Sequence, residues 1–76
     1  MEIDKMILNV YVLFDSLAEK FGSPFYETND ACAVRSIKKL LDEKEIGDYK
    51  LFLCGTFDNS SDVPLKINNT LQEVEL

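Results

Sequence analysis

The stretch Met6–Phe14, with the sequence MILNVYVLF, is the clearest predicted β-strand in this chain. It is rich in β-branched, aromatic and leucine residues, which are enriched in strands. Side chains alternate between the two faces of a strand. One face is therefore wholly apolar, and we expect it to point into the core: it carries Leu8, Val10, Val12 and Phe14.

The opposite face of this strand is also mostly apolar, with Ile7, Asn9, Tyr11 and Leu13. One helix covers only one face of a small sheet, so the second face needs another cover. The C-terminal tail or a second copy of the chain can supply it. We favour a homodimer with an interface made by Ile7, Tyr11 and Leu13.

A single amphipathic helix is predicted over Asn29–Lys44. Asn29 or Thr28 caps its N-terminus, and Asp30 in the first turn complements the helix dipole. Gly47 ends the segment. At 100° per residue, the apolar side chains fall within an arc of about 120° that faces the sheet: Ala33, Val34, Ile37, Leu40 and Leu41.

Two further strands are predicted at Tyr49–Phe57 and Val63–Ile67, and Pro64 restricts the second to a sheet edge or a strand start. Phe25-Tyr26 is a short stub of strand. Residues 15–24 form either a hairpin turn or a short helical turn. Residues 68–76 form either a last strand or a short helix.

These elements predict an α+β fold with a small three- to four-stranded, mostly antiparallel sheet. One helix packs on one face, and the element order is β-α-β-β. The 76 residues form a single small domain over residues 1–76. A chain this short buries little surface, so it gains stability from pairing with a second subunit.

Composition excludes several classes of site. The chain has no His and only two Cys, Cys32 and Cys54. His-dependent catalytic triads are therefore impossible, and a four-ligand zinc site lacks its ligands. We expect no catalytic residue, no metal, no cofactor and no enzymatic activity, with both thiols reduced.

No apolar run approaches the roughly 18 residues that a membrane helix needs. The residues before Met6 do not form a basic leader of the kind found in signal peptides. We therefore expect a protein of the cytoplasm that has no membrane partner.

The formal net charge of −6 repels nucleic acid at long range. Binding to DNA would need a local basic patch. The exposed side of the predicted helix offers one in Arg35, Lys38 and Lys39, with Lys50 as a further candidate. An ordinary solvated helix face, partly neutralised by nearby acidic residues, is the competing interpretation.

Several short motifs recur together along residues 7–60. Pro24-Phe25 precedes a helix start that contains Asn29-Asp30-Ala31, Ala33 and Arg35. A strand follows with Tyr49, Leu51, Gly55, Phe57 and Asp58. In these features the chain resembles the small nonstructural protein of gokushoviruses, the single-stranded DNA phages of the Microviridae.

This resemblance implies a nonenzymatic role with viral DNA, at the switch from duplex replication to single-strand synthesis and packaging. The implied partners are single-stranded DNA and viral or host replication and packaging proteins, in the host cell cytoplasm. Arg35, Lys38, Lys39 and Lys50 are then the expected nucleic-acid-binding residues. The alternative is a small acidic inhibitor or adaptor that binds a basic surface of a host or viral protein.

Overall fold

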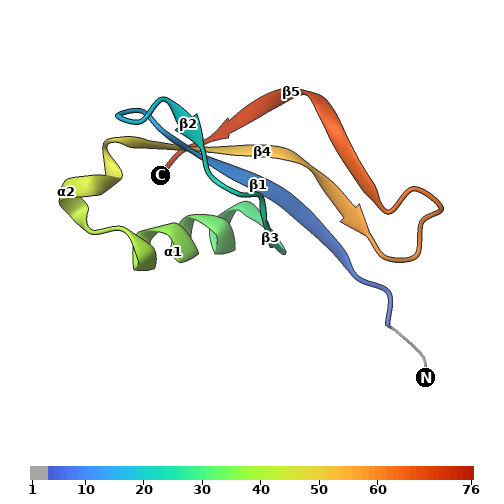
Figure 1. The fold of residues 1–76 in the computed structure, drawn as a ribbon. Coiled ribbons are helices and arrows are strands. Elements are labelled where there is room, and N and C mark those ends of the chain that lie inside the picture. The colour runs from blue at the N-terminus through green and yellow to red at the C-terminus, as the bar shows by residue number, and fades with distance from the viewer. Residues whose placement is uncertain (1–3) are drawn as a thin grey trace.

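The computed structural model describes residues 4–76 (Figure 1). Its elements, in chain order, are β1 (Ile7–Asp15), β2 (Lys20–Phe21), β3 (Phe25–Glu27), α1 (Asp30–Leu40), α2 (Glu43–Ile46), β4 (Tyr49–Asp58) and β5 (Leu65–Val74). All strand pairs are antiparallel. The predicted antiparallel sheet with a helix is confirmed. The expected β-α-β-β order is too simple, because two short strands precede α1 and a second helix follows it.

β1 is the centre of the sheet. One of its edges pairs with β4 along its whole length, from Ile7 opposite Asp58 to Asp15 opposite Tyr49. Its other edge is shared by β2 near Phe14 and by β3 near Val10. β5 lies outside β4. The strand stub expected at Phe25 is therefore a true sheet partner of β1.

The connection between β1 and β2 is a hairpin, which settles the choice left open for residues 15–24. A turn over residues 16–19 joins the two strands. The Asp15 carboxylate accepts hydrogen bonds from the backbone N–H groups of Leu17 and Ala18, at 3.0 and 3.1 Å. Glu19 closes the turn with a φ of 57°, in the left-handed region.

α1 begins where the sequence predicts and ends earlier. The side chain of Asn29 accepts a hydrogen bond from the backbone N–H of Cys32 at 2.8 Å, so Asn29 is the N-cap. The helix stops at Leu40 because Leu41 is extended and Asp42 caps a new helix. The Asp42 side chain accepts from the N–H groups of Lys44 and Glu45. The predicted continuous helix to Lys44 is therefore wrong, since an aspartate competes well for exposed backbone N–H groups.

The buried core lies between α1 and the sheet. Tyr11 and Leu51 from the two central strands form a cluster with Ala33 and Ile37 of α1. Partly buried residues extend this cluster, namely Leu13, Phe25, Val34, Leu41, Leu53, Val74 and Leu76. The helix therefore covers the Tyr11 face of β1. We had expected it to cover the face of Leu8, Val10, Val12 and Phe14, so the predicted assignment of the two faces is reversed.

This reversal changes the expected dimer interface. Tyr11 is 0% exposed beneath α1, and Leu13 packs against the same cluster. Tyr11 is therefore inaccessible to a second subunit while the helix is in place, whereas Leu13 is only partly buried. Ile7 stays exposed, at 55%. This packing removes Tyr11 from the expected interface, whereas dimerisation itself remains a prediction.

β5 is a single strand that bends away from the sheet in its middle. Leu53 pairs with Gln72 whereas Gly55 pairs with Ile67, so residues 68–71 of β5 have only Cys54 opposite them. Figure 1 shows this bend on the side of the sheet opposite α1. The predicted strand at Val63–Ile67 and the uncertain tail are thus one element, and Pro64 lies just before it.

Gly55 allows the close approach of β5 next to this bend. A Cβ atom added at Gly55 would lie 2.2 Å from the backbone oxygen of Lys66 and 3.1 Å from Cα of Ile67. Both neighbours are backbone atoms that cannot move without breaking the strand pair. Every residue larger than glycine at this position therefore displaces the first half of β5.

We predict that Gly55→Ala lowers the free energy of unfolding by about 1–3 kcal/mol, because the added methyl group overpacks the β4–β5 pair. Urea denaturation followed by circular dichroism measures this change. Gly47→Ala is the matched control, since no atom lies within 4 Å of an added Cβ there. An equal loss in both variants would contradict the proposed close contact.

The hydroxyl group of Tyr11 links the sheet to the start of α1. It donates a hydrogen bond to a carboxylate oxygen of Asp30 at 2.6 Å and accepts one from the Asn9 side-chain amide at 3.0 Å. Burial, followed by the hydrogen bond to Asp30, raises the pKa of Tyr11 to about 12. Ionisation of this tyrosine is therefore disfavoured in the folded state.

We predict that Tyr11→Phe lowers the free energy of unfolding at neutral pH by about 1–2 kcal/mol, through the lost hydrogen bond to a carboxylate. Because the folded pKa exceeds the unfolded value of 10.0, wild-type stability is full below pH 10 and falls as the pH rises toward 12. Tyr11→Phe should lose less stability than the wild type over this range. Equal pH profiles for the two proteins would contradict the assignment.

Candidate functional site

The outer face of α1 is cationic. Arg35, Lys38 and Lys39 are exposed, whereas Ala33 and Ile37 are buried on the inner side. The spacing of the three cations by three and four residues makes them neighbours on the helix surface. α1 carries these three cations and one carboxylate, Asp30, for a net charge of +2. The whole chain has a net charge of −6, so the residues outside α1 have a net charge of −8. Positive charge is therefore concentrated on α1.

Lys50 lies on the other side of the sheet. It neighbours Leu51, which points into the core beneath α1, and it pairs with Phe14 across β1. Alternation along β4 therefore directs Lys50 away from the helix. Of the four expected nucleic-acid-binding residues, the structure brings Arg35, Lys38 and Lys39 together and separates Lys50 from them.

Arg35 also contacts the half-buried thiol of Cys32, one helical turn earlier. Its Nη2 lies 3.9 Å from the Cys32 sulfur, and the Thr28 hydroxyl lies 3.5 Å from the same atom. Cys54 is buried in β4, and burial raises the pKa of its thiol. Both cysteines are free.

The face of the sheet opposite α1 carries five aromatic rings, and we call it the aromatic face: Phe14, Phe21, Tyr26, Phe52 and Phe57. The Phe21 ring lies 4.9 Å from Phe14 and 6.1 Å from Phe52 between centroids. The Tyr26 and Phe57 rings lie 5.8 Å apart. These distances are typical of favourable aromatic pairs.

The five rings form two groups, one of Phe14, Phe21 and Phe52 and one of Tyr26 and Phe57. In each group, a ring from a strand on one edge of β1 contacts a ring from β4 on its other edge. Tyr26 on β3 contacts Phe57 on β4, and Phe21 on β2 contacts Phe52 on β4. Such contacts require the sheet to curl toward this side. The curl accounts for Val10, which is only 2% exposed although no helix covers its face. The sequence shows aromatic residues in both Met6–Phe14 and Tyr49–Phe57, but it gives no sign that they converge.

A shallow apolar groove opens at one end of the aromatic face. Met6, Leu8, Tyr26 and Phe57 line it, and its volume is about 310 Å³. Its lining contains no charged side chain. The groove is suited to apolar or aromatic groups, and not to phosphate.

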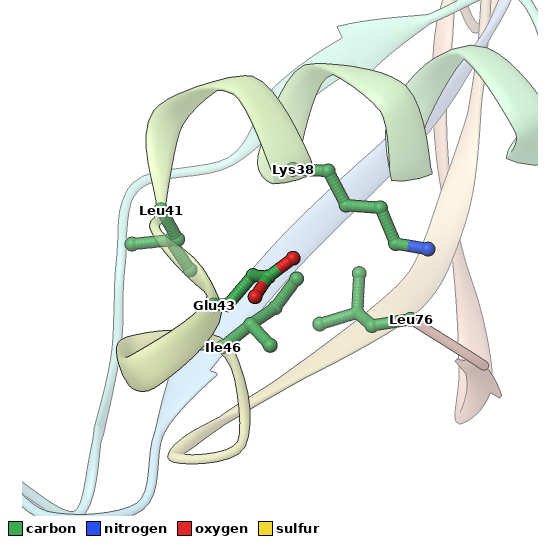
Figure 2. Close-up of a pocket in the computed structure, with 5 residues that line it drawn as sticks. All are labelled: Lys38, Leu41, Glu43, Ile46 and Leu76. Carbon is green, nitrogen blue, oxygen red and sulfur yellow. The ribbon is translucent and has the colours of Figure 1, made fainter.

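A second cavity of about 360 Å³ lies between the two helices and the C-terminus. Figure 2 shows Lys38 from α1 and Glu43 from α2 reaching toward this opening, with Leu76 on another side of it. Leu41 and Ile46 complete the lining. Lys38 therefore stands at the border between the cationic face and this cavity, beside an acidic neighbour.

Carboxylates gather at the end of the sheet near α2. Asp15, followed by burial and then by Glu45 and Asp48, raises the pKa of the Tyr49 hydroxyl. The backbone N–H of Ser16 donates to the carbonyl oxygen of Asp48 at 2.9 Å, which holds the β1–β2 turn against this end. A locally acidic surface thus lies at this end of the sheet, beside Tyr49.

Residues 4–76 contain no group of three or more His, Cys, Asp or Glu side chains placed to hold a metal ion. No helix in this part of the chain is long and apolar enough to cross a membrane.

Comparison with known proteins gives one family. The model of the phage ORF5 protein family matches residues 8–71, which span β1 through most of β5. The chain matches no curated protein and no solved structure. Because the family match covers the strands and helices that build both the cationic face and the aromatic face, the chain belongs to the phage ORF5 protein family.

Proposed function

We propose that this phage protein acts without catalysis in viral DNA replication or packaging, by binding single-stranded DNA through the cationic face of α1. The resemblance to gokushovirus nonstructural proteins supports this role within the phage ORF5 family. The observation that carries the proposal is the net charge of +2 on a helix in a chain of net charge −6. A local concentration of cations is what an acidic protein needs in order to contact phosphates.

Arg35 and Lys39 are central to this surface. They lie one turn apart, on the side of α1 away from the buried Ala33 and Ile37. Arg35 donates in a planar fork that suits a phosphate, and Lys39 provides a compact charge. Lys38 adds a third cation at the edge, where Glu43 is its neighbour across the cavity.

The acidic remainder of the chain limits the affinity. Its long-range field opposes DNA, so binding depends on short-range phosphate contacts from three side chains. Each contact displaces counterions from the strand, and for three contacts affinity should fall about 20-fold between about 50 and 200 mM salt. The expected interaction is weak, independent of base sequence and sensitive to salt.

We predict that Arg35→Glu combined with Lys39→Glu abolishes binding of a single-stranded oligonucleotide, measured by fluorescence anisotropy at low salt. The matched control is Lys20→Glu combined with Lys66→Glu, which makes the same charge change at two exposed positions on β2 and β5. The control should retain most of the binding. An equal loss in both variants would show that net charge alone governs the affinity, and no binding by the wild type would refute the proposal.

The Lys50→Glu variant distinguishes DNA binding through α1 from DNA binding through the aromatic face. Since Lys50 lies on the aromatic face, its reversal should leave binding through α1 nearly unchanged. Loss of binding in Lys50→Glu, with retention in the α1 variant, would place DNA on the sheet instead and overturn the assignment of the surface.

A second candidate function, an acidic adaptor or inhibitor, is favoured by the carboxylates around Tyr49. In this case the partner is a basic surface of a replication or capsid protein. We predict for this alternative that Glu45→Lys combined with Asp48→Lys weakens binding to such a protein from the same phage, measured by calorimetry. The Arg35 and Lys39 reversal should not weaken it. The opposite pattern would exclude the alternative.

A further inference from the structure

The aromatic face has no cover within the described part of the chain. α1 and α2 lie on the other side, and the exposed large apolar side chains of this face include Phe21, Tyr26 and Ile67. Phe21 is 52% exposed and Ile67 is 60% exposed. Tyr26 also lines the apolar groove of Met6, Leu8 and Phe57. Contiguous apolar surface of this kind marks an interaction site.

The molecule exposes more surface than a compact protein of its mass. Its accessible area is 5748 Å², whereas a compact monomer of 8.7 kDa exposes roughly 4,700 Å². The surplus of roughly 1,000 Å² belongs to the whole elongated molecule, and it leaves room for the ~800 Å² that each partner contributes to a standard interface. The radius of gyration is 13.6 Å, compared with about 11.4 Å for a compact domain of this length.

The charge pattern indicates what kind of partner fits. Alternation along the paired strands places two charged residues on the aromatic face, Lys50 and Glu73, and they are of opposite sign. The other charged residues at paired strand positions point to the α1 side of the sheet: Asp15, Lys20, Glu27, Asp58 and Lys66. A face of this composition attracts neither phosphate nor a strongly charged protein. Two chains of net charge −6 can meet there without bringing clusters of like charge together.

We propose that a second copy of the chain covers the aromatic face, so that two sheets pack face to face with both α1 helices outside. The rings of Phe21 and Tyr26 are exposed on this curled face, where they can interleave with the side chains of the second copy. The contact is isologous, since the same patch meets itself across a two-fold axis. The inference does not rest on DNA binding, but the dimer displays two cationic α1 faces on its exterior.

The full chain is tested by sedimentation equilibrium over a range of concentrations. The wild type should have twice the monomer mass of 8.7 kDa. Phe21→Glu combined with Ile67→Glu introduces four carboxylates into a two-fold interface, and should raise the dissociation constant at least about 100-fold. Tyr26→Glu is a second variant that tests the same face at its groove. All of these positions are exposed, and circular dichroism verifies that each variant keeps the fold.

Leu40→Glu is the matched control, because Leu40 is 75% exposed and lies on α1, away from the proposed interface. It should remain dimeric. Added salt should strengthen the dimer by screening repulsion between like-charged chains, the reverse of its effect on DNA binding.

A wild type that stays monomeric at high concentration overturns the proposal. So does a dimer that Leu40→Glu disrupts and the aromatic-face variants leave intact. If the wild type is monomeric and the Phe21 and Ile67 variant loses single-stranded DNA binding, the face is a stacking surface for bases and not a dimer interface.

Discussion

The packing of α1 against Tyr11 is the contact on which the rest of the structure depends. The ring of Tyr11 is fully buried with Ala33, Ile37 and Leu51, and it stacks on Phe25 with centroids 5.7 Å apart. Its hydroxyl reaches the carboxylate of Asp30 in the first turn of the helix. One residue of the central strand therefore fixes the position of β3, the start of α1 and the neighbouring strand β4 together.

This contact divides the molecule into two unlike sides. Once the helix occupies the Tyr11 face, its polar residues form one outer surface, and Arg35 and Lys39 stand on it. The other face of the sheet is left with aromatic and aliphatic side chains. No other element within residues 4–76 covers that face, so charge and apolar surface become separated onto opposite sides.

That separation gives the two proposed interactions different physical characters. Contacts between cations and phosphates weaken as salt screens them, whereas burial of apolar surface does not. The first depends on a few side chains of one helix, and the second on the curvature of the whole sheet. Both sides are built from residues within the region that the phage ORF5 family model matches.

Much of the local structure follows from the sequence, because it depends on neighbouring residues. The long strands at β1 and β4 follow from β-branched and aromatic residues, and Asn29 caps α1 through its own side chain. The closeness of Arg35, Lys38 and Lys39 is likewise set by helical periodicity alone. The end of α1 was harder to predict, because Asp42 competes for backbone N–H groups that a longer helix would have used.

The face of β1 that α1 covers is set by contacts between distant segments of the folded chain. Both faces of Met6–Phe14 are mostly apolar, so alternation by itself gives no preference. In the structure the helix lies on the Tyr11 face, where the Tyr11 hydroxyl donates to the Asp30 carboxylate. The same choice places Lys50 apart from the helix cations and gathers aromatic residues from four strands on one side. The strands, the helix start and the spacing of its cations can be read from the sequence, because they depend on near neighbours. Which side chains share a surface emerges from the folded chain, since that depends on contacts between segments far apart in it.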